Sequence, residues 1–528
     1  MGVIAPPPDR TRASSTRPTR SLGWWIAASV VLIPALVPPI SLAIQVLLSG
    51  TGLIFPTSRL IELLAATLGL AVAVTITSLS IGTITAWLTT RTDLRGRNTW
   101  MVLAALPLVI PSYMAALTVI GATGNNGLLA AIGLTIPTPY GFWGAWLALS
   151  LFLAPLAHLT IIPGLRAIDP AIEDAGVGLG ASRWRVFWTI TLPQLRPSLV
   201  SAALMIGLYT LSDFGAVSLL RYDTFTRAIY TLYAGQIDRR PAATLSLILM
   251  ALALTVLTIE WSTRRRAGYR SSSTKRGRRL VVLRGPGRFV SIGFLGSLTA
   301  ISLLLPVSVL IYWLVRGLRL GNELGSLWDE VGRTLGIALA AAAVTVVAAF
   351  PLAMVTTWKR RRMSTTYESV AWGAYSLPHI TVGVAVIAFV LRSAPIVYQT
   401  AALLLLVYMG MFLAQAMSPI QDSLRRASPD LEDASRGLGR GQLTTLRRIT
   451  LPITTPGLLA AATLVFISVM KELPATLLLR PNGFETLAIR IWSATGEAFY
   501  TRASAASLAL LAVSIVPLLV MTRRDLNT

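Results

Sequence analysis

The segment IEDAGVGLGASRWRVFWTITLP (Ile172–Pro193) occurs a second time in the chain as LEDASRGLGRGQLTTLRRITLP (Leu431–Pro452). The two copies align without a gap: Asp174 and Asp433 are each followed by Gly six residues later and by Ile ten residues after that, with Leu-Pro two residues beyond. Both copies are polar segments between long apolar runs. A membrane protein with two matched polar loops is expected to present both of them to one symmetric partner.

The composition places the chain among membrane proteins. Of its 528 residues, 54% are apolar and only 13% are charged, and many apolar runs are about 20 residues long, the length that crosses a bilayer as a helix. We therefore predict an all-α polytopic membrane protein with about 12 transmembrane helices, arranged as two parallel six-helix repeats. The first run is too long for a removed signal peptide and is predicted to be a retained helix. The predicted spans are 22–48, 61–89, 99–121, 140–164, 197–220, 241–261, 289–315, 327–357, 367–391, 396–419, 456–479 and 503–522.

The formal net charge of +24 is unevenly distributed along the chain. Most of the 46 Lys and Arg residues fall in the N-terminal tail, in alternate loops, in the central linker and in the C-terminal tail. This is the positive-inside bias, so both termini and both repeated loops are predicted to be cytoplasmic, in a bacterial or archaeal cytoplasmic membrane. The basic runs 264–266, 275–279 and 359–362 are then expected to face anionic lipid headgroups, and nucleic acid is not predicted as a partner.

The repeat extends beyond the polar loops. Residues 67–69 and 334–336 both read TLG, and the Leu-Pro pair at 106–107 recurs at 377–378. The linker between the halves is polar and rich in Arg, Ser and Gly, so we expect a flexible tether. The predicted organisation is a basic, disordered cytoplasmic tail at 1–21, a first transmembrane domain at 22–262, a basic cytoplasmic linker at 263–287 and a second transmembrane domain at 288–528.

Enzyme chemistry has little support in the sequence. There is no Cys, and the two His residues, His158 and His379, are isolated within predicted spans, where a packing role is favoured over a metal site. The three lysines, Lys275, Lys359 and Lys471, follow Thr, Trp and Met, whereas a phosphate-binding loop requires Gly-Lys-Ser/Thr. The chain is therefore predicted not to be an enzyme and to contain no metal or cofactor, so ATP must be used by a separate protein.

Each polar loop is predicted to be a helical hairpin. The Asp-Pro pair at 169–170 and the Ser-Pro pair at 428–429 combine a capping residue with a proline suited to the first turn, so that a short helix begins there. Gly180 and Gly439 interrupt that helix, and the Leu-Pro pairs are predicted to end a second short helix before the next span. Apolar residues on such a hairpin form a knob for a groove on a partner; the alternative is an ordinary amphipathic interfacial helix.

At these residues the chain resembles the permease subunits of ABC importers. Their cytoplasmic EAA loop has the pattern E-A-A, three residues, G, nine residues, I, one residue, L-P, and both copies fit at the Gly, Ile, Leu and Pro positions. They depart at the acid, which is Asp in place of Glu, and at the third position, where Gly176 and Ser435 replace Ala. The resemblance covers the chain from about residue 22 and implies the type I importer permease fold, as two fused domains with EAA loops at 171–193 and 430–452.

In that family the EAA loop docks into a cleft of an ATPase subunit and transmits its closure to the membrane helices. The resemblance implies three partners: two copies of an ABC ATPase, which use the ATP, an extracytoplasmic substrate-binding protein, and the lipid bilayer. The outer loops 221–240 and 480–502 are the predicted contact surface for the binding protein. The resemblance assigns ATPase docking to Glu173, Asp174, Ala175, Gly180, Ile190, Leu192, Pro193, Glu432, Asp433, Ala434, Gly439, Ile449, Leu451 and Pro452.

Two acids occupy matching positions in the membrane. The 259-residue offset between the repeats superposes Asp213 on Glu472, and LLRY at 219–222 on LLRP at 478–481. Ionisable groups are costly in a bilayer, so they usually line a pathway or pair with one another. Lys471 is a candidate partner for Asp213 across the interface between the halves. A structural ion pair and a role in the translocation pathway are both open, and the two roles can coexist.

Segments 211–235 and 469–492 resemble the corresponding segments of fused permeases for ferric iron, which are fed by a ferric-ion-binding protein. The resemblance implies transport of Fe³⁺, a hard cation that favours oxygen ligands such as Asp213 and Glu472. Permeases for thiamine, phosphonates or polyamines are the alternative. A secondary transporter shares the helix count but gives no reason for paired hairpins. A membrane-embedded enzyme requires a cluster of catalytic residues that the sequence does not supply.

Overall fold

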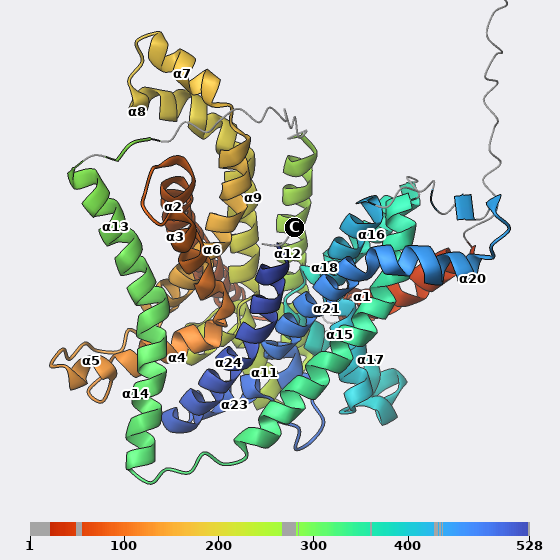
Figure 1. Cartoon of the computed structure of the whole chain (residues 1–528). Helices are drawn as coiled ribbons and strands as arrows, with labels where there is room; N and C mark the ends of the chain where they lie inside the picture. The colour runs from red at the N-terminus through yellow and green to blue at the C-terminus, as the bar shows by residue number, and fades with distance from the viewer. Residues whose placement is uncertain are drawn as a thin grey trace, which may run out of the picture.

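The computed structural model describes residues 22–48, 55–266, 281–283, 285–358, 362–426, 431, 434–435 and 437–525. This part of the chain is almost entirely helical, as predicted (Figure 1). Within it, the sole pairing of extended segments is an isolated bridge between Thr92 and Val281. The N-terminal tail predicted at 1–21 lies outside the described residues.

The number of membrane spans is close to the twelve predicted. Among the described residues, nine helices are long and apolar enough to cross a bilayer, and eleven spans result if each of two bent helix pairs counts as one. α24 (Tyr500–Asp525) lies where the twelfth span is predicted, and its apolar stretch, Tyr500–Ile515, is shorter than the others. The nine unbent spans contain α1 (Leu22–Leu48), α2 (Thr57–Arg91), α6 (Phe142–Ala167), α9 (Leu192–Ser212), α12 (Arg240–Arg266), α13 (Pro286–Thr299) with η3 (Ala300–Leu304) and α14 (Leu305–Arg319), α15 (Leu327–Trp358), α18 (Ala401–Arg426) and α21 (Leu451–Met470).

Two predicted spans are each bent into two helices. Span 99–121 consists of α3 (Arg97–Ala105), the short turn η1 (Leu106–Val109) and α4 (Ser112–Ala122), with a bend of 94°. Span 367–391 consists of α16 (Arg362–Tyr375) and α17 (His379–Ser393), with a bend of 101°. The prediction of one continuous helix is wrong in both cases. Pro111 and Pro378 have ψ angles of 156° and 125°, outside the helical range, and neither has the N–H that a helix interior requires.

The spans predicted at 197–220 and 456–479 are also interrupted, so that the prediction of unbroken helices is wrong there too. α9 ends just before Asp213 and is followed by α10 (Gly215–Leu219), while α21 ends just before Lys471 and is followed by α22 (Pro474–Leu479). Asp213 is extended, with ψ of 131°, which ends α9 at this point. The remaining short elements are α5 (Leu128–Ala131), α7 (Pro170–Gly178), α8 (Arg183–Val186), η2 (Phe187–Thr191), α11 (Phe225–Gly235), η4 (Pro395–Val397), α20 (Gln442–Thr445), η5 (Leu446–Thr450) and α23 (Leu487–Gly496).

The two halves repeat one arrangement of helices. α2, α6 and α9 pack against one another in the first half, and α15, α18 and α21 do so in the second. The peripheral helices of each half pack against the other half: α1 and α12 contact α17 of the second half, and α14 contacts α4 of the first. Small residues allow close approach: a Cβ added to Gly82 of α2 would lie 2.8 Å from the carbonyl oxygen of Ala154 in α6. One continuous core of buried apolar side chains therefore spans both halves.

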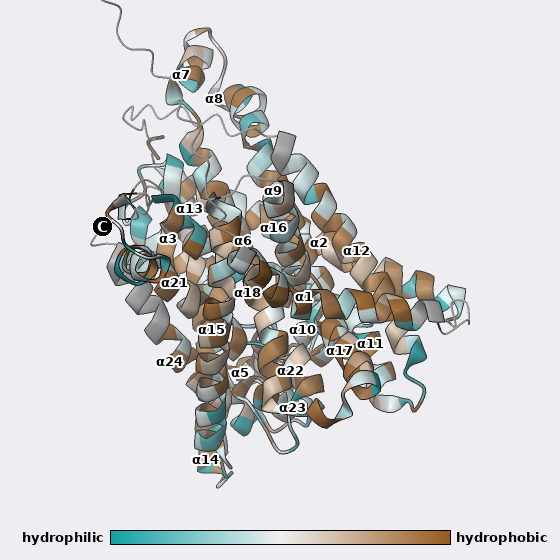
Figure 2. Ribbon diagram, turned by 90° about the vertical axis from the view of Figure 1, so that its right-hand side faces the viewer, coloured by the Kyte–Doolittle hydropathy of each residue, from teal (hydrophilic) through white to brown (hydrophobic). Residues whose placement is uncertain are grey.

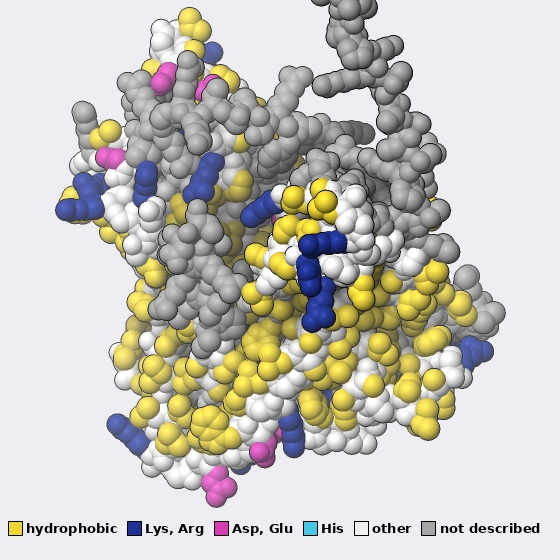
Figure 3. Space-filling model, turned by 45° about the vertical axis from the view of Figure 1, so that its right-hand side comes forward, with side chains coloured by type: hydrophobic (Ala, Val, Ile, Leu, Met, Phe, Trp, Pro, Cys, Tyr) yellow, Lys and Arg dark blue, Asp and Glu magenta, His cyan; other side chains and the backbone are white. Residues whose placement is uncertain are grey.

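The helices of the bundle are largely hydrophobic (Figure 2), and many large apolar side chains are exposed on its outside. Ile26, Val72, Ile76 and Val347 have exposed fractions of 54%, 57%, 61% and 74%. On the face drawn in Figure 3, such side chains form a broad band, and Lys and Arg gather above it, with a few more at the lower rim. A surface of this kind is stable only against lipid, so the band is the membrane-facing surface.

The range predicted as the linker, 263–287, is partly ordered. α12 continues to Arg266, and α13 begins at Pro286. Just before α13, Val281 pairs with the end of α2: its N–H donates to the Arg91 carbonyl oxygen at 2.8 Å, and its carbonyl accepts from the Asp93 N–H at 3.2 Å. Residues 267–280 lie outside the described residues. The start of the second half is thus attached to the first half at the end of α2.

Candidate docking hairpins and central cavity

The first repeated loop is a helical hairpin, in line with the sequence. Asp169 begins it, because its carboxylate accepts a hydrogen bond from the Ala171 N–H at 2.9 Å. α7 ends at Gly178, and Gly180, two residues later, is in the left-handed conformation with φ of +86°. The Ala181 N–H then donates to the Gly176 carbonyl oxygen at 3.2 Å, the six-to-one bond of a Schellman motif, which reverses the chain direction.

The second loop repeats this turn. Gly439 has φ of +76°, and the Arg440 N–H donates to the Ser435 carbonyl oxygen at 3.2 Å, which is the same bond in the corresponding position. Of the predicted docking residues, Glu432 and Asp433 lie outside the described residues, whereas Ala434 is described and exposed. The two hairpins therefore share their turn geometry.

The arms of the two hairpins are packed by different side chains at the same positions. In the first, Gly176 leaves room for the other arm, since an added Cβ would lie 3.0 Å from Ile190 Cδ1 and 3.1 Å from Val186 Cγ2. In the second, Ser435 and Thr445 replace Gly176 and Val186, and their hydroxyl oxygens are 3.0 Å apart in a hydrogen bond. This exchange explains why Ala is absent from the third position of the EAA pattern in both copies.

Leu-Pro does not end the second arm of either hairpin, and this prediction is wrong. The arm passes through a turn of π-helix, η2 or η5, directly into α9 or α21. In that turn the Leu192 N–H donates to the Phe187 carbonyl oxygen, and the Leu451 N–H donates to the Leu446 carbonyl oxygen, five residues back. The wider turn accommodates the proline that follows, so that each hairpin is continuous with a membrane span.

Large apolar side chains are exposed on both hairpins. Leu179 and Trp184 have exposed fractions of 89% and 70% in the first, and Leu438 and Leu443 have 80% and 77% in the second. α7 and α8 project beyond the bundle at the top of Figures 1 and 2, and α20 lies on the right side of Figure 1, at about mid-height. These side chains are suited to contact a groove on another protein.

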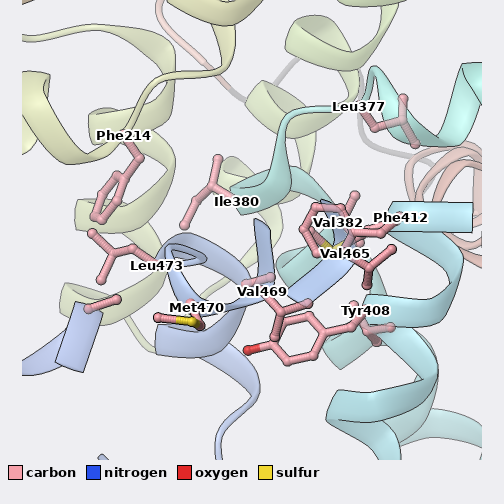
Figure 4. Close-up of a cluster of buried hydrophobic side chains, with 14 of the residues drawn as sticks. Phe214, Leu377, Ile380, Val382, Tyr408, Phe412, Val465, Val469, Met470 and Leu473 are labelled. Carbon is pink, nitrogen blue, oxygen red and sulfur yellow. The ribbon is translucent and has the colours of Figure 1, made fainter. Parts of the chain in front are cut away.

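A cavity of about 780 Å³ lies between the two halves. The bends and breaks described above surround it, because its wall includes the starts of α4, α10, α17 and α22. Figure 4 shows part of its apolar wall, in which Phe214, Leu377, Phe412 and Leu473 are buried around the break between α21 and α22. Its ionisable lining residues are Asp213, Glu260, Glu368, His379, Lys471 and Glu472, accompanied by Tyr113, Tyr209 and Tyr375.

The two repeated acids hold matching positions at this cavity. Asp213 accepts hydrogen bonds from the N–H groups of Ala216 and Val217, at 3.1 and 3.3 Å, and so caps α10. Glu472 accepts from the Ala475 N–H at 3.0 Å and caps α22 in the same way. Both residues are only 6% exposed. The acids thus hold the two helix breaks in place and line the cavity at the same time.

Each acid also meets the first residue of a bent helix of its own half. The side chain of Ser112 lies against Asp213, and His379 Nδ1 is 2.6 Å from a carboxylate oxygen of Glu472. Ser112 and His379 directly follow Pro111 and Pro378, the residues at the bends before α4 and α17, so the structure makes them counterparts, although the sequence pairing set Pro107 against Pro378. Sequence reasoning missed the contact of His379 with Glu472, because it favoured a packing role for this residue.

Lys471 does not form the predicted ion pair with Asp213. Among the ion pairs of the described residues, none joins these two side chains, and the Lys471 ammonium lies 3.5 Å from the carbonyl oxygen of Val109 at the α3–α4 bend. Lys471, Asp213 and Glu472 nevertheless line the same cavity. The geometry brings the three residues together as cavity-lining groups.

The comparisons with known proteins agree with this geometry. The model of the family described as binding-protein-dependent transport system inner membrane component matches residues 90–263 and 346–524. The chain belongs to this family. Each matched segment contains one hairpin and one of the acids that line the cavity, so the repeat corresponds to two copies of the family's domain.

Three relatives of this permease illustrate the range of cargo in their names. The Fe(3+)-transport system permease protein FbpB 2 of Haemophilus influenzae is 31% identical over 509 residues, which cover 95% of this chain and 98% of that protein. The ferric transport system permease protein FbpB of Actinobacillus pleuropneumoniae is 26% identical over 446 residues, 80% of this chain and 65% of that protein. The molybdenum transport system permease protein ModB of Escherichia coli is 33% identical over 199 residues, 35% of this chain and 86% of that protein.

Family membership makes the chain a multi-pass transport component that works with an ATPase and a substrate-binding protein, and not an enzyme. The end of the permease away from α7 carries α11 and α23, in the predicted outer loops 221–240 and 480–502 (Figure 1). There Arg59 pairs with Asp223 at 2.9 Å, and Arg490 pairs with Glu330 at 3.0 Å. These ion pairs fix the loops of both halves to the ends of α2 and α15.

Proposed function

We propose that this permease carries ferric iron through a bacterial or archaeal cytoplasmic membrane as part of a binding-protein-dependent ABC importer. The observation that carries the proposal is the cavity lined by Asp213, Glu260, Glu368 and Glu472. Carboxylate and phenol oxygens suit a hard trivalent cation, and two relatives that match most of the chain are named as Fe³⁺ or ferric permeases.

The cavity is suited to passage and not to storage of the ion. Within the described residues, no group of three or more His, Asp or Glu side chains is placed to hold a metal. The acids instead lie along the wall, with Asp213 and Glu472 at the helix breaks and Glu260 and Glu368 on α12 and α16. We infer that the ion contacts one or two carboxylates at a time, so that binding is weak enough for release.

In the proposal, two copies of a separate ATPase bind this permease, one at each hairpin. These copies bind and use the ATP, and the permease itself needs no cofactor. The matched turns at Gly180 and Gly439 and the exposed apolar side chains support this arrangement. Both termini then lie in the cytoplasm with the hairpins, and an extracytoplasmic binding protein contacts the opposite end at loops 221–240 and 480–502. Closure of the ATPase pair moves α9 and α21, which continue from the hairpins to the cavity.

The test is uptake of radioactive ferric iron by proteoliposomes that contain the permease, its ATPase and its binding protein. Asp213→Asn and Glu472→Gln should each lower uptake at least about tenfold, equivalent to about 1.4 kcal/mol in the transport barrier. Both variants keep a side-chain oxygen that can cap α10 or α22, so the charge is lost without the helix break. Asp329→Asn, which removes an exposed acid of α15, is the control and should keep full uptake.

The identity of the cargo is tested by uptake of alternative substrates into the same proteoliposomes. The proposal expects uptake of ferric iron and none of thiamine, a phosphonate or a polyamine. Uptake of one of these compounds in place of iron would contradict the assignment of ferric iron as cargo, but it would be consistent with an ABC importer. Uptake without the ATPase would contradict the importer itself and favour an ion-coupled transporter.

A further inference from the structure

The first half surrounds its cavity acid with neutral oxygen atoms. Ser112, the first residue of α4, lies against Asp213, and Ser212 precedes Asp213 in the chain. All three side chains line the cavity. The two N–H groups of α10 that cap onto Asp213 both donate to one carboxylate oxygen, Oδ2. Because a hard cation prefers oxygen ligands, this side of the cavity offers a carboxylate and two hydroxyl groups of a suitable kind.

The second half surrounds its acid with basic groups. His379, the first residue of α17, lies 2.6 Å from Glu472 through Nδ1, and Lys471 precedes Glu472 in the chain. An ionised carboxylate only accepts hydrogen bonds, so the imidazole is the donor. This bond goes to Oε2, while Oε1 accepts from the Ala475 N–H at 3.0 Å. Both carboxylate oxygens of Glu472 are therefore bound by groups of its own half.

Lys471 adds a positive charge to the same cavity. Its counterpart at the 259-residue offset is Ser212, and both side chains line the cavity. The Lys471 ammonium extends toward the first half, where it lies 3.5 Å from the carbonyl oxygen of Val109. Because like charges repel, this ammonium weakens the binding of a cation in the cavity unless an acid offsets it. The two other acids of the described lining, on α12 and α16, come one from each half, so the walls differ in charge at the helix breaks.

We propose that the two repeated acids have different roles: Asp213 contacts the cargo cation, whereas Glu472 offsets the charge of Lys471. The hydroxyl groups of Ser112 and Ser212 complete the cation contacts beside Asp213. Lys471 limits how tightly the cavity holds the cation, which permits its release. This inference rests on the proposed transport of ferric iron. It implies that Glu472 becomes dispensable once Lys471 is replaced by a neutral residue, whereas Asp213 does not.

The test is uptake of radioactive ferric iron by proteoliposomes that contain the permease, its ATPase and its binding protein. Glu472→Gln alone should lower uptake at least about tenfold, because the charge of Lys471 is then no longer offset. Adding Lys471→Met should return uptake to within about threefold of the parent, since both charges are then gone. Adding Lys471→Met to Asp213→Asn should leave uptake at least about tenfold below the parent, because the cation has lost its carboxylate.

Lys471→Arg is the matched control, because it keeps the charge of the side chain. Combined with Glu472→Gln, it should leave uptake low, so that recovery with Lys471→Met is attributed to charge.

A second measurement examines the cation site without the ATPase. Terbium(III) is a hard trivalent cation whose emission is excited through nearby tyrosine, and Tyr113 and Tyr209 line the cavity. It is titrated onto the permease in nanodiscs of zwitterionic lipid. The apparent affinity should fall about tenfold in Asp213→Asn and stay within about threefold of the parent in the double variant Glu472→Gln with Lys471→Met.

Three results would overturn the inference: uptake by Glu472→Gln that Lys471→Met does not raise, equal recovery of Asp213→Asn by Lys471→Met, or equal recovery of Glu472→Gln by Lys471→Arg. Failure of the underlying function looks different. In that case the unmodified permease would take up no iron in the presence of its ATPase and binding protein.

Discussion

Replacing Gly180 with Ala tests whether the hairpin turn presents the docking surface. Gly180 has φ of +86°, and no atom lies within 4 Å of a Cβ added there, so the cost of Ala is confined to the backbone. A left-handed conformation costs an L-residue about 1–2 kcal/mol. If this strain shifts the hairpin away from its docking conformation, the apparent dissociation constant of the ATPase rises in inverse proportion to the remaining fraction. The upper limit is a five- to thirtyfold weaker affinity, at about 1.4 kcal/mol per factor of ten.

The assay is titration of the isolated ATPase onto the permease in lipid nanodiscs. Gly178→Ala is a matched control, because Gly178 belongs to α7, has no close neighbour at an added Cβ and does not have a positive φ. The same comparison is available in the second hairpin with Gly439→Ala and Gly437→Ala. The reasoning is refuted if the variants at 180 and 178 bind the ATPase equally well.

Two other substitutions test packing. Gly82→Val should separate α2 from α6, because even a Cβ at position 82 would lie 2.8 Å from the Ala154 carbonyl oxygen. The yield of monodisperse protein should therefore fall severalfold. Gly69→Ala is the control and should leave the yield unchanged, because no atom lies within 4 Å of a Cβ added at position 69. Ser435→Ala removes the hydrogen bond to Thr445 and should weaken the second hairpin by about 1 kcal/mol, measured as faster amide hydrogen exchange at the start of η5. Adding Thr445→Val also removes the hydrogen bond of 3.2 Å from the Thr445 hydroxyl to the Gly441 carbonyl, so the double variant should exchange at least as fast as Ser435→Ala. Full recovery of the protection in the double variant would contradict this account of the pair.

Much of the fold follows from local signals in the sequence. The length of the apolar runs predicted the spans, and the repeated spacing around Gly180 and Gly439 predicted two hairpins with matched turns. These features depend on residues close together in the chain. The bends did not follow, because proline alone does not decide them: α1 contains Pro34, Pro38 and Pro39 and is one helix, whereas the chain bends at Pro111 and Pro378.

The polar contacts at the cavity depend on packing between distant segments. Asp213 and Glu472 were recognised from their offset, but the partners that they would meet were not. Lys471 is next to Glu472 in the sequence, yet its ammonium lies near the Val109 carbonyl and not near Asp213. His379 meets Glu472 because α17 begins after a bend of 101°, which no local pattern specified.

The most direct test of the account is the mass of the intact complex, measured by native mass spectrometry on the permease purified with its ATPase. Two structurally matched hairpins in one chain predict two ATPase copies per permease, with occupancy that falls when Gly180 or Gly439 is replaced. A complex that contains a single ATPase, or a permease that retains none under conditions that support uptake, would contradict the claim that each hairpin is a docking site.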